Sequence, residues 1–463
     1  MVFSSLEFIF FFLPLVTVPY MIFKNIRVRN LILITASILF YAFGEPKAVI
    51  LMLLSIVFNY GLAMLMEKYK AYKKLFLIIA VIINLALLFV YKYTGFFAES
   101  INNVFSLNID VPVIHLPIGI SFFTFQAMSY VIDVYRGDTP VQKRLSSILL
   151  YISFFPQLIA GPIVKYHDIE KQIDTRVVSF ENYALGIKRF LFGLFKKVLI
   201  ANNAGALWSL ISGMDIASIS LASAWLGAIA YTLQIYFDFS GYSDMAIGLG
   251  KMFGFDFLEN FNYPYISKSI REFWRRWHIS LSTWFKEYLY IPLGGNRRGS
   301  IRTYVNLIIV FFCTGLWHGA SWNFVIWGMW HGLFSVLERL GLGRLLEKDK
   351  TTVISRIYTL FVVVAGFAIF GIVDFNHLKE YMGVMLFNSN GLLIDYSFLF
   401  MLKNNVFILL SGILISMPVY GIVKDKNIKV LNIVSVILYT AGFILSIAYL
   451  VSSSYNPFLY FRF

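Results

Sequence analysis

Long apolar stretches recur along the whole of this 463-residue chain. A helix that crosses a bilayer needs about 20 mainly apolar residues, and eleven stretches approach that length. Only 14% of the residues are charged, whereas a soluble domain carries about 25%. The sequence therefore predicts an all-α, polytopic membrane protein with a single membrane-embedded domain over residues 1–463. The predicted spans are 6–23, 30–43, 49–66, 74–91, 119–135, 222–237, 302–316, 323–340, 355–373, 405–423 and 430–451.

Two shorter apolar stretches, 154–164 and 241–257, are interrupted by proline or glycine. Irregular backbone at membrane depth persists only where it is buried in protein or lines a water-filled cavity. We therefore expect re-entrant segments around an internal site. Residues 183–203 mix Lys and Arg with Leu, Ile and Phe, which is typical of a basic helix at the cytoplasmic interface. That helix is interpreted either as an anchor for lipid head groups or as a docking site for an anionic acyl donor.

The basic residues indicate which loops face the cytoplasm. The net charge is +14, and in a chain this apolar, basic loops report topology and anionic lipids rather than nucleic acid. Lys and Arg gather at 24–29, 68–74, 136–144, 339–350 and 424–429. The positive-inside rule then places both termini outside the cytoplasm. The first apolar stretch lacks a basic leader and a cleavage site, so we expect it to be a retained span.

Ionisable residues inside a membrane protein indicate function, and here they concentrate between residues 236 and 331. The stretch YFDFSGYSDMAIG holds Asp238 and Asp244, six residues apart among aromatic side chains. These carboxylates could be catalytic, with Tyr236 and Asp238 contacting a substrate. They could equally cap a broken helix, because Asp and Ser satisfy exposed backbone N–H groups. The structural role is the favoured interpretation.

The stretch SIREFWRRWHISLSTWFKEYLYIPLGG predicts a helix with one polar face. Ser269 and Glu272 form a capping box, so the helix begins near Ser269, and it ends before Pro292. Residues three and four apart share a helix face, and four polar side chains recur at those spacings: Arg271, Arg275, His278 and Ser282. We expect this face to line a cavity. Solvated arginines at the interface would explain Arg271 and Arg275 but not His278.

A third polar group lies in CTGLWHGASWNFVIWGMWHG, where His318 ends an apolar run. A neutral imidazole can accept a proton from an alcohol near pH 7, so His318 is a candidate catalytic residue. Trp317 and Asn323 lie close enough in sequence to contact a substrate. The alternative for His318 is a hydrogen-bonded core histidine, and His331 is interpreted as a packing or orienting residue. We expect no metal site, because no cysteine or acidic residue accompanies His278 and His318 at ligand spacing.

The stretches RRWHISLSTWFKEYLYIPLGGNRRG and GLWHGASWNFVIWG together resemble the membrane-bound O-acyltransferase superfamily. Within it, the sequence is most similar to the branch that O-acetylates alginate, other bacterial polysaccharides and peptidoglycan. FFPQLIAGPIVKY, FDFSGYSDMAIG, YIPLGGNRRG and the C-terminal YNPFLYFRF extend the resemblance. It implies that His318 is catalytic and that His278 is a second functional histidine. It also implies a ring of helices, about 11 or more of them spanning, around a central funnel.

For such an enzyme the donor is a cytoplasmic acyl thioester such as acetyl-CoA, bound as a substrate and not as a resident cofactor. The acceptor would be an extracytoplasmic polysaccharide or an acyl-accepting partner protein, at a bacterial plasma membrane. Arg275 and Ser282 are expected to contact the donor, because adjacent arginines suit its phosphates. Three alternatives stay open: D-alanyl transfer from a carrier protein to teichoic acid, a transporter or flippase, and a non-catalytic scaffold.

Overall fold

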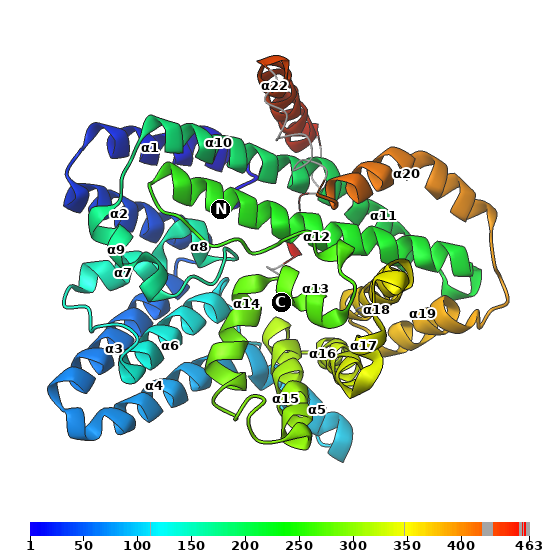
Figure 1. Cartoon of the computed structure of the whole chain (residues 1–463), viewed down its shortest axis with the longest axis horizontal. Helices are drawn as coiled ribbons and strands as arrows, with labels where there is room; N and C mark the ends of the chain where they lie inside the picture. Colours follow the sequence, from blue (N-terminus) through cyan, green and yellow to red (C-terminus); the bar gives the residue numbers. More distant parts are fainter. Residues whose placement is uncertain (112, 347, 419–428, 453–455, 457, 460–463) are drawn as a thin grey trace. The chain divides into compact units, whose positions relative to one another are not determined.

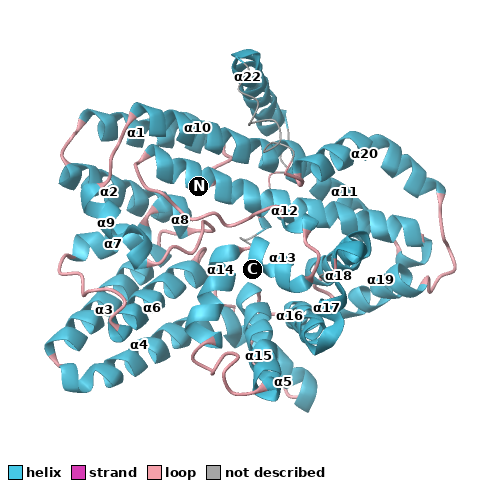
Figure 2. Ribbon diagram, in the orientation of Figure 1, coloured by secondary structure: helices cyan, strands magenta, loops and turns pink. Residues whose placement is uncertain are grey.

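The computed structural model describes residues 1–463 except 112, 347, 419–428, 453–455, 457 and 460–463. Its regular structure is helical, and the described residues contain no strand (Figure 2). The chain divides into two compact units. Unit 1 comprises Met1–Leu191 and Tyr242–Glu259, and unit 2 comprises Phe192–Gly241 and Asn260–Phe463.

Seven helical segments within the described ranges are long and apolar enough to cross a membrane. They are Ile26–Gly44, Ala48–Lys68, Lys70–Phe105, Ser300–His318, Thr352–Gly371, Tyr396–Ile415 and Val434–Ser452, and Phe8–Ile22 is a shorter apolar helix. The predicted all-α, multi-pass architecture is therefore confirmed. The predicted spans 119–135, 222–237 and 323–340 are also helical, although the first and last form helices of only 17 and 16 residues. The end of the span 405–423, most of the basic loop 424–429 and most of the C-terminal YNPFLYFRF lie outside the described residues.

Unit 1 is built mainly from the first ten α-helices (Figure 1). These are α1 (Leu13–Ile22), α2 (Ile26–Gly44), α3 (Ala48–Lys68), α4 (Lys73–Leu88), α5 (Thr94–Phe105), α6 (Ile120–Arg136), α7 (Leu145–Ser153), α8 (Phe155–Leu158), α9 (Tyr166–Thr175) and most of α10 (Phe180–Phe195). Short π-helical segments precede α1 (Phe8–Phe12) and follow α4 (Phe89–Tyr93), and a 3-10 turn (Lys70–Tyr72) precedes α4.

Paired amides join two of the membrane-spanning helices of unit 1. Asn59 on α3 and Asn84 on α4 are both buried, and each donates its side-chain N–H to the other's carbonyl, at 3.3 and 2.8 Å. A bilayer supplies no water for these groups, so polar side chains that pair across helices hold them together. Apolar periodicity alone gave no indication of this contact.

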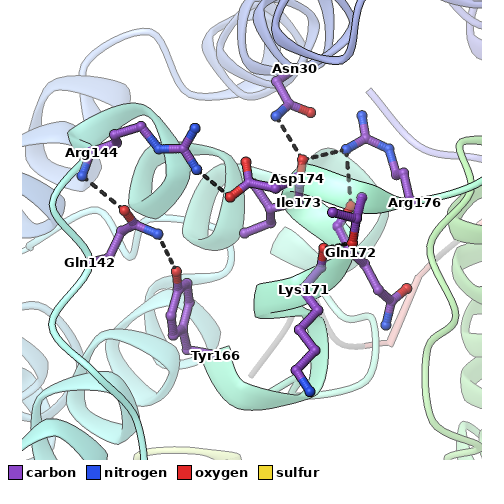
Figure 3. A network of polar contacts seen from close by, with 10 residues as sticks. Asn30, Gln142, Arg144, Tyr166, Lys171, Gln172, Ile173, Asp174 and Arg176 are labelled. Carbon is purple, nitrogen blue, oxygen red and sulfur yellow. Dashed lines mark hydrogen bonds and ion pairs between the residues drawn. The ribbon is translucent and has the colours of Figure 1, made fainter.

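A polar network anchors α9 within unit 1 (Figure 3). The guanidinium of Arg176, just after the last turn, donates to the carbonyl oxygens of Gln172 and Ile173 at 3.3 and 3.0 Å. Asn30 on α2 donates to the same Ile173 carbonyl at 2.9 Å, and Arg144 forms an ion pair with Asp174. Carbonyl groups at a helix C-terminus have no partner within the helix, so these donors complete the end of α9. The predicted irregular segment 154–164 leads into this region and contains only the four-residue α8.

Unit 2 contains most of the remaining helices. They are α11 (Asn202–Ser212), the first part of α12 (Leu221–Met252), α13 (Ile270–Arg276), α14 (Ile279–Phe285), α15 (Ser300–His318), α16 (Trp322–Leu337), α17 (Gly343–Leu346), α18 (Thr352–Gly371), α19 (Phe375–Phe387), α20 (Tyr396–Ile415) and α22 (Lys429–Ser452). π-Helical segments lie at Lys196–Ala201, Lys286–Tyr290 and Glu338–Leu342, and 3-10 turns at Ile216–Ser218, Pro264–Ile266 and Asp349–Thr351.

The helix α12 corrects one prediction. The interruption expected from Gly241 onwards is absent up to Met252, because α12 runs unbroken from Leu221 for 32 residues. Gly241 serves close packing instead of a break: a Cβ atom there would lie 2.8 Å from the carbonyl oxygen of Gly193 on α10. Gly241 therefore lies where α12 packs closely against α10, and the helix does not end there.

Candidate active site

The two helices that carry His318 and its neighbours pack with almost no space between their backbones (Figure 1). A Cβ atom on Gly315 of α15 would lie 2.4 Å from the carbonyl oxygen of Phe324 on α16. One on Gly328 of α16 would lie 2.3 Å from the carbonyl oxygen of Phe311. Small residues permit such approach in membrane proteins, where packing replaces the hydrophobic effect as the driving force. The glycines around W-H-G thus fix the seam between α15 and α16.

His318 is the last residue of α15 and lies in an aromatic enclosure. Its side chain is buried, and three rings meet it edge to face: Trp317 at 5.1 Å, Trp327 at 4.9 Å and Phe370 at 5.3 Å between centroids. Gly319 follows in extended conformation, and a Cβ atom there would meet the Phe324 ring at 2.2 Å. The motif therefore ends the helix at the histidine and holds the imidazole inside the protein.

His278 lies at a break between two seven-residue helices, which corrects the prediction of one continuous helix. Its φ of +42° and ψ of +55° are left-handed. The backbone N–H of Ile279 donates to the carbonyl oxygen of Asn260, at 2.9 Å, instead of continuing the helical ladder. A new helix then begins with the Ser282 N–H bonded to the His278 carbonyl at 3.0 Å. A hydrogen bond to a residue distant in sequence has thus replaced a helical one, and the regular helical spacing is interrupted at His278.

The break changes which side chains lie together. His278 is fully buried and its ring centroid lies 6.5 Å from that of His318, whereas Arg275 is exposed. The expectation that Arg275, His278 and Ser282 share one face is therefore wrong. The two histidines nevertheless lie close together within unit 2, although their catalytic roles stay predictions. Trp317 also belongs to this group, at 5.9 Å from His278.

An apolar cavity of about 240 Å³ approaches the histidine pair. Its walls are mostly aromatic and aliphatic, and Arg271, Lys286, Glu338 and Arg339 contribute charges. Neither histidine lines it. Thr314 does, and it lies one turn before His318, about 6 Å along α15. Ser282, four residues beyond His278, also lines it, as do Ser269, Trp274, Leu281, Phe285, Tyr290, Leu307, Val310, Phe311, Ser335 and Gly343.

A second, basic pocket of about 430 Å³ shares Ser269 and Arg271 with the apolar cavity. Its other lining residues are Asn262, Lys268, Glu272, Arg275 and Arg276. The lining therefore contains four cationic side chains and one carboxylate, so the pocket carries a net positive charge. Arg276 is partly neutralised, because its Nε donates to Glu272 at 2.9 Å. Arginine forks bind phosphate oxygens in bidentate fashion, so the pocket suits a phosphorylated group.

The acidic motif YFDFSGYSDMAIG holds its carboxylates in ion pairs. Asp238 pairs with Lys197, both side chains being 2% exposed, and its second oxygen accepts the backbone N–H of Leu459 at 2.9 Å. Asp244, in unit 1, pairs with Arg189 at 2.6 Å. These contacts support the structural interpretation, although α12 is not broken here and no helix end is capped, and substrate contact by Asp238 stays a prediction. Lys197 had been expected at a lipid interface and instead lies in the core.

Two further candidates occupy structural positions near the histidines. Asn323 donates its side-chain N–H to the Phe370 carbonyl oxygen at 2.9 Å, which ties the start of α16 to α18. Tyr236 is buried, with its ring 5.1 Å from that of Tyr265 and 6.1 Å from that of Trp277. These positions show packing functions. Substrate contact by either residue stays a prediction.

Two residues that sequence reasoning missed organise the site. Asn260 contacts His278, with its Oδ1 at 3.2 Å from Nδ1 of the ring. Glu338 accepts the first two backbone N–H groups of α13, from Ile270 at 2.6 Å and Arg271 at 3.1 Å. A carboxylate there accepts hydrogen bonds from N–H groups that have no partner within the helix, and its negative charge interacts favourably with the positive end of the helix dipole. Glu338 could have been noticed as a charged residue at the end of an apolar run, whereas no sequence pattern distinguished Asn260.

Within the described part of the chain, no three His, Cys, Asp or Glu side chains gather as a metal site.

Comparison with known proteins places these features in one family. The sequence model of the membrane-bound O-acyltransferase family matches residues 140–374, which include the stretches around both histidines. The chain belongs to this family. The chain is 44% identical to the probable alginate O-acetylase AlgI of Pseudomonas aeruginosa strain PAO1 over 378 residues, 80% of this chain and 72% of that protein.

Other relatives in the family differ in what their names specify. The peptidoglycan O-acetyltransferase of Helicobacter pylori is 42% identical over 373 residues, 73% of this chain and 70% of that protein. The teichoic acid D-alanyltransferase of Bacillus subtilis is 28% identical over 277 residues, 56% and 70% of the two chains. The protein is therefore a membrane-embedded O-acyltransferase, more similar to these O-acetyltransferases than to this D-alanyltransferase.

Proposed function

We propose that this protein transfers an acetyl group from a cytoplasmic acyl thioester, acetyl-CoA, to a hydroxyl of an extracytoplasmic polysaccharide or of an acyl-accepting partner protein. The observation that carries the proposal is the meeting of two buried histidines near an apolar cavity that shares Ser269 and Arg271 with a basic pocket. The similarity to alginate and peptidoglycan O-acetyltransferases supports acetyl over D-alanyl transfer.

The two cavities fit the two ends of such a donor. The phosphates would bind in the basic pocket, where Arg271 and Arg275 supply forked donors. The pantetheine arm and thioester would extend along the apolar cavity towards Thr314, one helical turn from His318. Exclusion of water from this route would also protect the thioester from hydrolysis.

The chemistry requires one proton acceptor. The acceptor hydroxyl attacks the thioester carbonyl, a C–O bond forms and the C–S bond breaks. His318 would take the hydroxyl proton as the bond forms and pass it to the departing thiolate, giving an acetyl ester and a free thiol. His278, whose ring lies 6.5 Å from that of His318, would help to orient the reacting groups.

The reaction is tested by incubating proteoliposomes with radiolabelled acetyl-CoA and an O-deacetylated polysaccharide, and measuring label in the polymer. Label transferred from acetyl-CoA supports the proposal. Label transferred only from an aminoacylated carrier protein would assign the chain to D-alanyl transfer instead, and no label from either donor would reject the enzymatic proposal.

Substitution of Arg275 tests the donor pocket. We expect Arg275→Ala to raise the KM for acetyl-CoA by about tenfold with a much smaller change in kcat, because a charge-assisted hydrogen bond to phosphate contributes binding of that order. Arg297→Ala is the matched control, since Arg297 is exposed and lines neither cavity. Equal effects of the two substitutions on KM would argue against a phosphate site at Arg275.

The orientation of the chain in the bilayer would determine from which side the donor and the acceptor reach His318. The basic loop 339–350 is predicted to be cytoplasmic, and Arg339 from that loop lines the apolar cavity. His318 lies roughly 27 Å along α15 from Ser300, which in a bilayer core about 30 Å thick is beyond the midplane and nearer the outer face. Acetyl-CoA would then enter from the cytoplasm and the hydroxyl from outside, so the acyl group crosses while the donor does not. Both termini would lie outside the cytoplasm.

Cysteine labelling checks that orientation. In a Cys313→Ser background, a cysteine replacing Ser300 should react only with reagent on the cytoplasmic side. One replacing Asn376, after the outward-going α18, should react only from outside. Both positions are exposed at helix ends, so labelling reports the side of the membrane and not burial. The opposite pattern, or reaction of both positions from one side, would contradict acyl transfer across the bilayer.

A further inference from the structure

Asn260 occupies a fully buried position in unit 2 beside the break between α13 and α14. Its side-chain Oδ1 faces three nitrogen and oxygen atoms of two residues. The backbone N–H and the hydroxyl of Ser280 lie at 3.1 and 2.9 Å, and Nδ1 of His278 at 3.2 Å. Its backbone carbonyl accepts the N–H of Ile279. One asparagine thus binds three consecutive residues, the first of which is the histidine.

These contacts settle which end of the amide faces the histidine. A side-chain amide can be placed either way round, and the choice must come from its partners. The backbone N–H of Ser280 can only donate, so the Asn260 atom that faces it is the carbonyl oxygen. That same oxygen faces Nδ1 of His278, so Nδ1 must be the donor. A neutral imidazole carries one proton, and with that proton on Nδ1 the lone pair lies on Nε2.

The same contacts hold His278 in a conformation that a histidine rarely adopts. Left-handed φ and ψ persist in a non-glycine residue only where the surroundings impose them, and such residues cluster at functional sites. Here the bonds from Ile279 and Ser280 to Asn260 fix the backbone after the histidine, and the bond to Nδ1 fixes the ring. Both the backbone and the tautomer of His278 therefore depend on one residue.

We propose that Asn260 is a positioning residue that holds His278 as the Nδ1–H tautomer, so that Nε2 acts as a hydrogen-bond or proton acceptor during acyl transfer. The proposal rests on the function proposed above. It assigns His278 a neutral, accepting role and distinguishes it from a protonated, donating one. Among the described residues, the titratable ring of His318 lies 6.5 Å from that of His278 between centroids, and the uncharged rings of Phe239 and Trp317 lie at 4.6 and 5.9 Å.

Asn260→Asp tests this through the pH profile. A carboxylate has the same shape and still accepts from Ser280 and His278, but it stabilises the imidazolium and so favours protonation of Nε2. The pH below which activity is lost should then rise by about 1–3 units, as expected for a charge at this range. The effect should fall on kcat, with the KM for acetyl-CoA nearly unchanged. Ser280→Ala is the control: it leaves the Ser280 backbone N–H and the bond to His278, and should give a wild-type profile.

A second measurement does not depend on activity. In protein labelled with ¹⁵N-histidine, the His278 resonances, identified by their loss in His278→Gln, should show a protonated Nδ1 and an unprotonated Nε2 at neutral pH. Asn260→Ala should abolish that preference and lower kcat about tenfold. An Nε2–H tautomer in the wild type, or an unshifted profile in a folded Asn260→Asp protein, would overturn the positioning role. Absence of acetyl transfer by the wild type would instead count against the proposed function and leave the tautomer measurement valid.

Discussion

Replacement of His318 by alanine should lower acetyl transfer by about 10²–10⁴-fold, the usual contribution of a general base. The imidazole lies at the end of α15, one turn beyond Thr314 on the cavity wall, where the donor thioester is proposed to arrive. Transfer of label from acetyl-CoA to polymer in proteoliposomes measures the loss. The loss should appear in kcat with little change in the KM for acetyl-CoA, because His318 does not line the donor cavity.

The control for this substitution is His331→Gln. His331 is as buried as His318, and its ring lies 5.2 Å from that of Trp327, the same indole that meets His318. A general requirement for buried histidine in this aromatic cluster would make both substitutions equally harmful. We expect His331→Gln to retain activity within about threefold, as for a residue outside the reaction. Near wild-type transfer by a well-expressed His318→Ala protein would remove His318 from the mechanism.

Many of the spans were predictable because they follow from local patterns. In a bilayer the backbone N–H and C=O groups must form hydrogen bonds within the chain, so apolar runs of bilayer length become helices. The helices α2, α3, α15 and α18 accordingly lie close to their predicted positions. His318 was selected as a candidate because tryptophan and glycine flank it at the end of such a run, and its catalytic role stays a prediction. These inferences needed no knowledge of which segments pack together.

The errors arose where a distant residue decides the local conformation. The helical spacing of Arg275, His278 and Ser282 was real, but Asn260, eighteen residues before His278, binds the backbone at the histidine and ends the helix there. In the same way Gly241 resembled a helix break, and Gly193 makes it a crossing point. Periodicity reports only neighbours in sequence, so neither outcome could be obtained from it.

The acidic motif illustrates the same limit for charge. Asp238 was a candidate substrate contact or helix cap, and its actual partner, Lys197, lies 41 residues away on another helix. Lys197 belonged to a stretch that resembled a membrane-surface helix. Burial of a charge costs desolvation free energy, and attraction to a buried charge of opposite sign offsets that cost. Each of these two residues is therefore stable in the core only with the other. A pattern of single-residue types cannot show which charges will be paired.

Asp238→Ala should therefore destabilise the protein strongly. It would leave the Lys197 ammonium buried without its carboxylate and would remove the acceptor of the Leu459 N–H. Breaking a buried ion pair by removing one partner typically costs about 3–5 kcal/mol. Thermal unfolding in detergent should show a large decrease in midpoint temperature. Asp256→Ala is the surface control, since its ion pair with Lys251 involves a carboxylate that is 71% exposed, and it should have little effect.

The double replacement Lys197→Met, Asp238→Leu decides between an electrostatic and a substrate-binding role. Apolar side chains of similar volume often replace a buried ion pair without loss of stability, so the double variant should recover most of the midpoint lost in Asp238→Ala. If Asp238 acts only through this pair, acetyl transfer should recover together with stability. A double variant that unfolds like the wild type but no longer transfers acetyl groups would show that this charged pair takes part in transfer, which is the alternative to the structural role favoured from the sequence. Recovery of both properties would assign the carboxylate to the architecture that holds Leu459 and α12 in place.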